Sequence, residues 1–291
     1  MQRLPPRSFQ AVHRPDGSLH LNEGPIDVVL RAWGAAAAVE DAYALVLDRF
    51  DGLLRRLVDE LPALRHPAAE PRHAFAGAVA QRMEAAVWPY RRRFITPMAA
   101  VAGAVADELV EVLATDPRIE RAFVNDGGDI ALHLAPGSSL TLGLVADVEA
   151  PRLDGSIVVT HAEPVRGVAT SGRGGRSFSL GIADAVTVLA RSAAAADAAA
   201  TVIANAVNLD HPAVRRMPAR SLDPDSDLGE LPVTVAVGAL PQEAIADALA
   251  AGATEAETLR AAGLVEAAAL WLMGRCRIVG RLPRLGVSLP T

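Results

Sequence analysis

The sequence is poor in residues on which several classes of protein depend. Among its 291 residues there is one cysteine, Cys276, and aromatic side chains make up only 4%. A single cysteine excludes an intrachain disulfide and a cysteine-based metal cluster. So few aromatic rings argue against a protein that binds single-stranded nucleic acid, because such proteins stack bases on those rings.

Positive charge is also scarce. The chain has 28 Lys and Arg residues against 34 Asp and Glu residues, which gives a formal net charge of −6. This balance provides no basic footprint for a nucleic-acid backbone, so we expect no nucleic-acid partner. A small phosphorylated ligand remains compatible with the charge, because its site needs only a few local arginines and main-chain N–H groups.

Long hydrophobic runs are missing as well. None reaches the roughly 20 residues that a membrane span requires, and the first residues lack the apolar segment of a signal peptide. We therefore expect a cytoplasmic protein with no membrane partner. Hydrophobic residues still make up 51% of the chain, which predicts a substantial core. Much of this fraction is alanine, which favours close packing of helices on sheets.

The periodicity of apolar residues predicts an α+β fold with two lobes, in which helices flank mixed or antiparallel sheets. We expect short strands within 8–31, helices over 35–65, 72–88 and 97–114, and strands over 119–125, 129–134, 139–146, 156–160, 165–170 and 183–190. After these we expect a helix over 193–207, a loop over 208–230, a strand over 231–237, helices over 241–251 and 255–273, and a strand over 275–280. No shift in composition marks an internal boundary, so a single domain over 1–291 is expected.

Asp197 and Thr201 are four residues apart on the predicted helix 193–207, so they share one of its faces. A carboxylate and a hydroxyl suit Mg²⁺, a hard cation that prefers oxygen ligands. In the structural alternative, Asp197 complements the positive N-terminus of the helix and Thr201 faces the core. The spacing by itself favours this alternative.

A segment rich in glycine and arginine runs from Thr170 to Ser177, with the sequence Thr-Ser-Gly-Arg-Gly-Gly-Arg-Ser. Glycines let successive main-chain N–H groups converge on an anion, and arginine pairs with phosphate oxygens in a bidentate manner. The order of residues matches neither the P-loop nor the Rossmann fingerprint. A hairpin loop with solvated arginines therefore explains the segment about as well as an anion site does.

An acidic glycine turn, Asn125-Asp126-Gly127-Gly128-Asp129, lies between two predicted strands. Its ordinary interpretation is a hairpin turn in which two glycines adopt positive φ. In a functional interpretation, Gly127 and Gly128 lie against a ligand while Asp126 or Asp129 accepts a hydrogen bond from it. The local sequence favours the hairpin turn.

The order of these segments resembles the ApbE-like superfamily, whose best-known members are magnesium-dependent FAD:protein FMN transferases. The similarity extends from about Ala102 to Val207. Residues 102–107, Ala-Gly-Ala-Val-Ala-Asp, are similar to the family's Lys-Gly-Tyr-Ala-Val-Asp helix but lack its lysine. Residues 124–130 are similar to its strand and Gly-Gly-Asp turn, and residues 169–172 to its Ala-Thr-Ser-Gly segment. Ala196-Asp197-Ala198 followed by Thr201 resembles its metal motif.

The resemblance implies a T-fold-related architecture and a set of site residues. In the family the Asp and Thr of the metal motif bind Mg²⁺ beside a main-chain carbonyl, which implies Asp197, Thr201 and the carbonyl of Ala169 or Thr170 here. The implied contacts to a cofactor, FAD or a related flavin or pterin nucleotide, are Gly103, Asp107, Asn125, Asp126, Gly127, Gly128, Asp129, Thr170, Ser171, Gly172, Arg173 and Arg176.

The chain also departs from the family pattern. The transferases carry His-Ile-Ile-Asp-Pro-Arg-Thr-Gly before a strand, whereas this chain has Gly181-Ile182-Ala183-Asp184 and runs directly into the strand. The histidine thought to assist transfer corresponds to Gly181, and the Pro-Arg-Thr-Gly loop, the signal peptide and the lipid-anchor cysteine have no counterpart. The chain is therefore most similar to a cytoplasmic branch of the superfamily whose activity is uncharacterised.

Three functions follow from this combination. The first is a flavin- or nucleotide-binding protein that acts as a Mg²⁺-dependent FMN transferase, with Asp184 as the nearby base and an acceptor protein as partner. The second is a non-catalytic accessory protein that holds a cofactor in flavin or pterin (one-carbon) biosynthesis, which the missing histidine favours. The third is an interaction protein with a vestigial site. The sequence leaves the oligomeric state open, a homodimer included.

Overall fold

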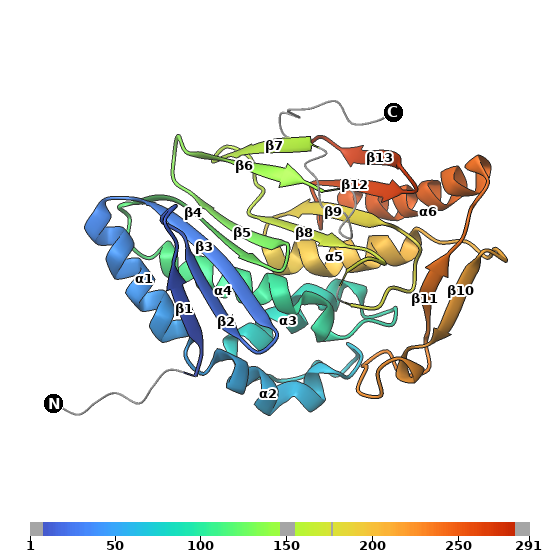
Figure 1. Ribbon diagram of the computed structural model, residues 1–291, viewed down its shortest axis with the longest axis horizontal. Helices are drawn as coiled ribbons and strands as arrows, with labels where there is room; N and C mark the ends of the chain where they lie inside the picture. The colour runs from blue at the N-terminus through green and yellow to red at the C-terminus, as the bar shows by residue number, and fades with distance from the viewer. Residues whose placement is uncertain (1–7, 146–154, 176, 283–291) are drawn as a thin grey trace. The chain divides into compact units, whose positions relative to one another are not determined.

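The computed structural model describes residues 8–145, 155–175 and 177–282, which form two compact units (Figure 1). The first unit takes in the chain up to Ser139 together with Ser192–Ala194, and the second takes in Leu140–Arg191 and the chain from Ala195 onward. Each unit combines antiparallel strands with helices, which confirms the predicted α+β class.

The sheet strands of the first unit are antiparallel and follow the order β1-β2-β3-β4-β5. The strands are β1 (Gln10–His13), β2 (Leu19–Glu23), β3 (Ile26–Gly34), β4 (Ile119–Asp126) and β5 (Asp129–Leu134). The helices are α1 (Ala36–Phe50), α2 (Leu53–Leu64), α3 (Ala78–Val87), the 3₁₀ turns η1 (Trp88–Tyr90) and η2 (Pro97–Ala100), and α4 (Val101–Leu113).

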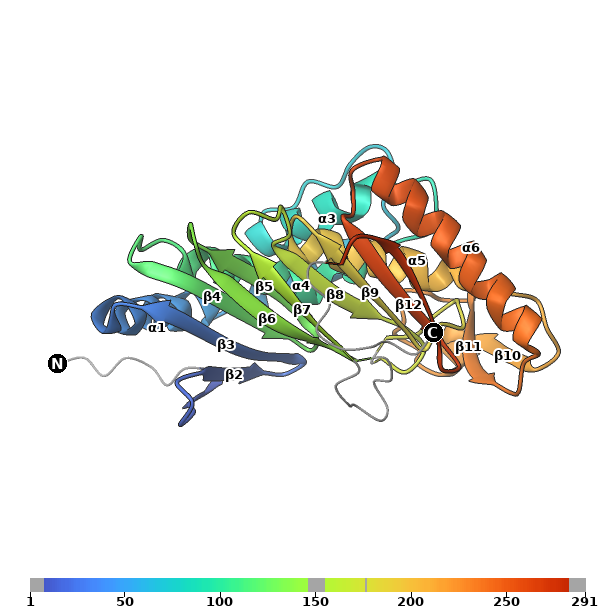
Figure 2. The same cartoon turned by 90° about the horizontal axis from the view of Figure 1, so that it is seen from above.

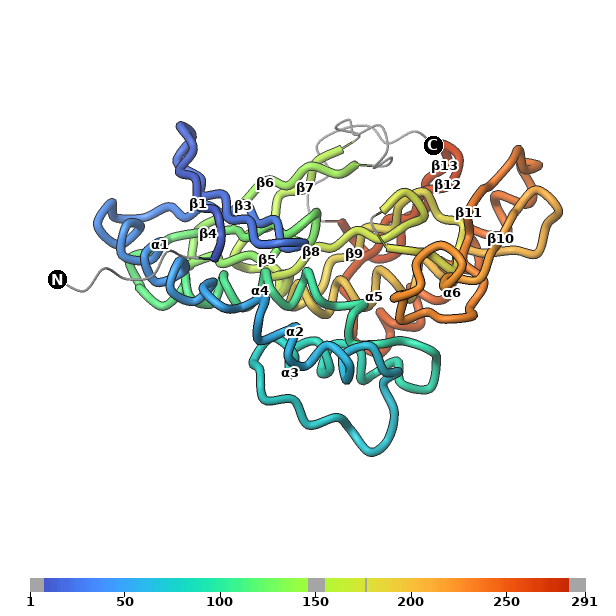
Figure 3. The backbone as a smooth tube through the Cα atoms, turned by 60° about the horizontal axis from the view of Figure 1, so that its bottom comes forward, coloured from blue at the N-terminus to red at the C-terminus, as the bar shows by residue number. Residues whose placement is uncertain are grey.

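Helices α1 and α4 cover one face of this sheet, and α2 and α3 lie beyond them (Figure 3). On β3, buried residues alternate with more exposed ones, as expected for a strand with one face in a core. Helix α4 lies between the sheet and α3, so its residues are buried on most sides. Its small alanine side chains allow this close packing.

Several helix boundaries in this unit differ from the prediction. The single helix expected over 35–65 is two helices, because Gly52 adopts the left-handed conformation with φ of 69° and breaks the helical path. The helix expected over 72–88 begins at Ala78. The first residues of the helix expected over 97–114 form the 3₁₀ turn η2, and α4 begins at Val101.

The second unit contains the antiparallel strands β8 (Gly167–Ser171), β9 (Ala185–Ala190), β12 (Ala267–Leu272) and β13 (Arg275–Gly280), in that order. Two further pairs are β6 (Ser139–Leu144) with β7 (Gly155–Thr160), and β10 (Val214–Pro218) with β11 (Pro232–Val237). The helices are α5 (Ala193–Ala206), whose first two residues belong to the first unit, α6 (Gln242–Ala261) and the short turn η3 (Ala219–Ser221).

Helices α5 and α6 lie on the same side of β8, β9, β12 and β13 (Figure 2). A side chain added to Gly252 of α6 would meet Val207, which directly follows α5, and Leu270 of β12. The face of β12 that carries Leu270 is therefore the face covered by the helices.

Two predictions for this unit are wrong. The two helices expected over 241–251 and 255–273 are the single helix α6, which ends at Ala261, and residues 267–272 form strand β12. The sequence Ala-Ala-Ala-Leu-Trp-Leu of β12 is buried at every position, and a fully buried strand has no alternation that would distinguish it from a helix. The loop expected over 208–230 contains strand β10, whose pairing with β11 the local sequence did not indicate.

Among the residues that the structure describes, no helix has the length and apolar character needed to cross a bilayer.

Candidate functional site

Asp197 and Thr201 both lie on α5, one helical turn apart as predicted. Both are partly exposed, whereas Ala196, Ala198 and Ala200 around them are buried. The two oxygen-bearing side chains therefore occupy the more open face of an otherwise apolar helix.

The start of α5 is held by a carboxylate from α4. The two oxygens of Asp107 accept hydrogen bonds from the main-chain N–H groups of Ala193 and Ala194, each at 2.9 Å. Asp107 is only 5% exposed, and burial raises the pKa of its carboxyl, although the two N–H donors and Arg82 act in the opposite direction. Asp107 therefore supplies negative charge at this helix end.

Gly103 lies one turn before Asp107 on α4, and it also contacts the start of α5. A Cβ atom on Gly103 would lie 2.4 Å from the carbonyl oxygen of Ala193 and 2.7 Å from the nitrogen of Ala194. Only glycine allows the two backbones to approach so closely. Gly103 and Asp107 therefore both hold α4 against the start of α5.

The acidic glycine segment forms the two-residue turn that joins β4 and β5. Gly127 and Gly128 have positive φ values of 63° and 112°, and Asn125 accepts a hydrogen bond from the N–H of Gly128 at 2.8 Å. This is the hairpin geometry that the local sequence favours. Asp126 is buried and accepts from the N–H of Asp27 at 3.4 Å, while Asp129 pairs with Asp126 across the hairpin.

In the second unit, Arg173 of the segment rich in glycine and arginine forms an ion pair with Asp184, which directly precedes β9. Nε and Nη2 of Arg173 donate to Oδ1 of Asp184 at 3.0 and 2.7 Å, and the other carboxylate oxygen accepts from the N–H of Met273. Both oxygens of the predicted base are therefore engaged. Gly172 lies so close to this pair that a Cβ atom there would be 2.3 Å from the carbonyl oxygen of Asp184. Arg176 lies outside the described residues.

Gly181, which the sequence resemblance aligns with the histidine of the transferases, packs against α5. A Cβ atom on Gly181 would lie 2.0 Å from the carbonyl oxygen of Ala204 and 2.9 Å from Cα of Asn205. Distances below 3 Å to backbone atoms require the backbone to move. The segment is fixed further by hydrogen bonds from the N–H of Leu180 to Asn205 and from the N–H of Ile182 to Val207.

Thr170 and Ser171, the two hydroxyl-bearing residues of β8, point to opposite faces of the sheet. Thr170 pairs with Thr187 of β9, which in turn pairs with Ala269 of β12, the neighbour of Leu270. Because side chains alternate along a strand, Thr170 points away from the face that carries α5 and α6, whereas Ser171 points toward it. The Thr170 hydroxyl forms a 2.8 Å hydrogen bond with that of Thr187. Ala169 is buried beside them.

Sequence reasoning missed three partners of these residues. Thr187 is a buried hydroxyl in an otherwise apolar strand, a signal visible in the sequence. Met273 and Ala204 contribute only main-chain atoms, so their side chains gave no signal.

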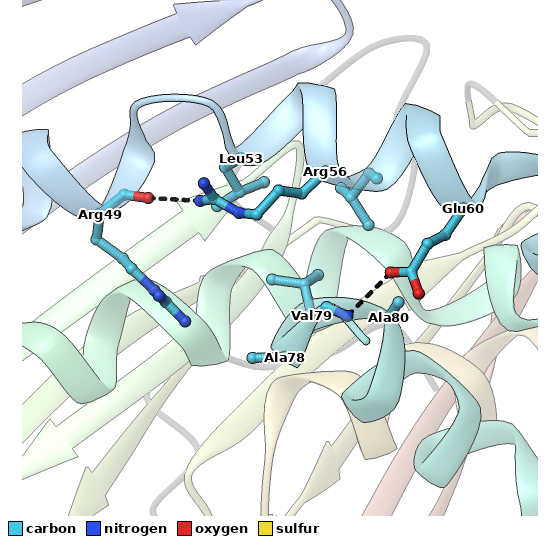
Figure 4. A pocket seen from close by; sticks show the side chains of 9 residues that line it. Arg49, Leu53, Arg56, Glu60, Ala78, Val79 and Ala80 are labelled. Atoms are coloured by element: carbon cyan, nitrogen blue, oxygen red, sulfur yellow. Dashed lines mark hydrogen bonds between the residues drawn. The ribbon is translucent and has the colours of Figure 1, made fainter. Parts of the chain in front are cut away.

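A small cleft in the first unit lies between α2 and the start of α3 (Figure 4). It has a volume of about 20 Å³, which is enough for about one water molecule and far too small for a nucleotide. Its polar groups are already engaged, since Arg56 donates to the carbonyl of Arg49 and Glu60 accepts from the N–H groups of Ala76 and Gly77. The cleft therefore does not qualify as the ligand site.

A protein-family model described as AbpE bacteria matches residues 10–278. The chain belongs to this family. Membership confirms the ApbE-like resemblance, and it extends the similarity well beyond the central segment that carries the motifs.

Relatives of this AbpE family member include proteins of archaea. The UPF0280 protein of Methanopyrus kandleri is 38% identical over 214 residues, which is 72% of this chain and 83% of that protein. The UPF0280 protein of Methanothrix thermoacetophila is 38% identical over 117 residues, which is 40% of this chain and 48% of that protein. A solved structure of a mutant flavin transferase ApbE from Vibrio cholerae has 14% identity and a TM-score of 0.45, and the alignment covers 94% of this chain and 97% of that chain.

Proposed function

We propose that this AbpE family member binds a flavin nucleotide together with Mg²⁺ and does not carry out histidine-assisted flavin transfer. The observation that carries the proposal is the pair of side chains on α5, Asp197 and Thr201, which are one turn apart and partly exposed. A carboxylate and a hydroxyl at this spacing are hard oxygen donors. The main-chain carbonyl of Ala169 or Thr170 is the third ligand that we propose.

The donor set fits magnesium better than a transition metal. Among the described residues, no group of three or more His, Cys, Asp or Glu side chains is placed to hold a metal ion. A site with only two protein side chains needs further oxygens from main-chain carbonyls, water and ligand phosphates, which is the usual environment of Mg²⁺. When bound, the ion draws negative charge from a pyrophosphate and stabilises an oxygen leaving group.

Arg173 and Arg176 are the groups that we propose for the phosphates of the ligand. In Arg173, Nε and Nη2 face Asp184, so Nη1 remains to donate to a phosphate oxygen. Asp184 thereby orients the guanidinium group. With both of its oxygens engaged, it is poorly prepared to take a proton from an acceptor hydroxyl.

The blocked position of Gly181 supports binding without histidine-assisted transfer. No side chain can occupy this position unless the backbone of α5 moves, so the chain has no acid or base there. The accessory role in flavin or pterin cofactor biosynthesis follows from this feature. A Mg²⁺-dependent FMN transferase that uses a different base is the competing function.

Calorimetric titration with FAD, FMN and a pterin nucleotide, each with and without Mg²⁺, tests the proposal. We expect FAD binding that requires Mg²⁺ and is lost in Asp197→Ala and Thr201→Ala, with no AMP detected by chromatography. Thr258→Ala is the matched control, because Thr258 is an exposed helical threonine of α6 that bonds to the carbonyl of Thr254.

Three outcomes decide between the functions. Magnesium-dependent binding without AMP supports the accessory role, whereas AMP release that Asp197→Ala abolishes establishes the transferase. Failure of all ligands to raise the melting temperature overturns both, because a ligand at 100 times its dissociation constant adds about 2.7 kcal/mol to stability.

A further inference from the structure

Helix α5 begins without a charged residue of its own. Its first four residues are alanines, and its first turn contains no acidic side chain. The N–H groups at the start of any helix lack partners within that helix and carry partial positive charge. A carboxylate from elsewhere in the chain can therefore stabilise the start of α5.

Asp107 of α4 meets this need with both carboxylate oxygens. Oδ1 and Oδ2 each lie 2.9 Å from one N–H, of Ala193 and Ala194 respectively, in a site that leaves Asp107 5% exposed. Hydrogen bonds from N–H groups to a buried carboxylate are among the strong ones, because the acceptor is charged and water is excluded.

Gly103 brings α4 close enough for this contact. With the carbonyl oxygen of Ala193 only 2.4 Å from its Cβ position, Gly103 lets the two backbones touch one turn before Asp107. Ala193 and Ala194 are buried in the hydrophobic core of the first unit. The start of α5 is thus fixed by a backbone contact, two hydrogen bonds and apolar packing.

Helix ends fray, and the loss of order decreases with distance from the end. Asp197 is the fifth residue of α5 and Thr201 the ninth, so fraying of the first turn reaches Asp197 first. A cation that needs both side chains binds more tightly when their separation is fixed before binding.

We propose that Asp107 is a positioning residue for the cation pair: it docks the first turn of α5 and so keeps Asp197 and Thr201 at ligand spacing. This role rests on the proposed function, because it concerns the same Mg²⁺ pair. It makes Asp107 an indirect partner of the ion: loss of a helix cap typically weakens the helix start by about 2- to 30-fold, and we expect Mg²⁺ affinity to fall by up to that factor.

The experiment compares the wild-type protein with Asp107→Asn, Asp197→Ala and Glu111→Gln. Glu111 is the matched control, because it lies on the same helix one turn after Asp107 and its side chain is 63% exposed. Two quantities are measured: the Mg²⁺ dissociation constant by calorimetry in the presence of FAD, and the hydrogen-exchange rates of the Ala193 and Ala194 amides.

For Asp107→Asn we expect Mg²⁺ affinity to fall about 2- to 30-fold and the two amides to exchange about five to ten times faster. Asp197→Ala should abolish Mg²⁺ binding and leave the exchange rates unchanged. Glu111→Gln should change neither quantity. If Asp107→Asn does not fold, Asp107→Glu replaces it, because its longer carboxylate retains the charge but shifts the helix start, and the same two changes in smaller measure are expected.

Binding by the wild-type protein tests the proposed function, and the behaviour of Asp107→Asn tests the positioning role of Asp107. If the wild-type protein binds neither Mg²⁺ nor FAD, the proposed function fails and the positioning role fails with it. If the wild-type protein binds both and Asp107→Asn binds Mg²⁺ equally well, or if its amides exchange at the wild-type rate, only the positioning role is overturned.

Discussion

The carbonyl oxygen of Ala204 lies 2.0 Å from the point where a side chain on Gly181 would begin. This contact joins the segment before β9 to the last turn of α5. It also closes the position to which the sequence resemblance assigns the histidine of the flavin transferases.

Introducing a side chain at this position should therefore lower the stability of the protein. We expect Gly181→Ala and Gly181→His to lower the free energy of unfolding by about 1–3 kcal/mol or more, and Gly181→His to produce no transfer activity. Urea denaturation measures the loss. Gly238→Ala is the control, since its nearest neighbours lie at 3.5 Å and it should change stability by no more than about 0.5 kcal/mol. If the Gly181→His protein is as stable as the wild type, the backbone of α5 moves aside for the side chain at little cost in stability, and the prediction is wrong.

The ion pair between Arg173 and Asp184 should couple the two residues energetically. We expect Arg173→Gln and Asp184→Asn each to destabilise the protein, and the double variant to lose less than the sum, with a coupling energy of about 0.5–3 kcal/mol. Four urea denaturation curves give this value. Strictly additive losses would mean that Arg173 does not depend on Asp184, and the proposed orientation of its guanidinium group would be wrong.

Asp107 should give stability a specific dependence on pH. Burial raises its folded-state pKa above the ordinary aspartate value of 3.8, so protonation favours the folded state over the unfolded state. The contribution of this carboxyl to stability is therefore fully present below pH 3.8 and declines as the pH rises through the raised pKa.

Asp107→Asn, which cannot titrate, isolates this effect. The unfolding free energy of the wild type minus that of the variant should decrease as the pH is raised from about 3.5 to about 7. Urea denaturation at several pH values provides the difference. An increase with pH would mean that the N–H donors outweigh burial and lower the pKa.

Glu84 of α3 should be a site where substitution stabilises the protein. Both of its carboxylate oxygens are buried without a hydrogen-bond donor, Glu84 is 2% exposed, and Nε of Arg72 lies 3.9 Å away. A buried polar group without a partner costs about 1–3 kcal/mol, so Glu84→Met should raise the unfolding free energy by a comparable amount.

Thermal and urea denaturation of Glu84→Met test this expectation. Ala85→Met is the control, because Ala85 is the exposed next residue of the same helix and its substitution should change stability by no more than about 0.5 kcal/mol. A loss of stability in Glu84→Met would show that Arg72 compensates for the buried charge.

The sequence by itself determined the features that depend on neighbouring residues in the chain. The period of apolar residues identified the α+β class and most strands, the paired glycines at 127 and 128 identified the hairpin turn, and the spacing of Asp197 and Thr201 placed them on one helical turn. The order of the motifs was also enough to recognise the ApbE-like superfamily, because that order is a property of the chain alone.

Only the tertiary structure decided what depends on contacts between distant segments. Strand β12 reads as a helix in its alanine-rich sequence and is a strand because β9 and β13 pair with it on both sides. Asp107 and Gly103 contact the start of α5, which comes 86 residues after Asp107 in the chain, and no local pattern indicated this contact. The space around Gly181 is likewise set by the backbone of α5, which no side-chain pattern records. Such contacts join main-chain atoms far apart in the sequence, so they appear only once the chain has folded.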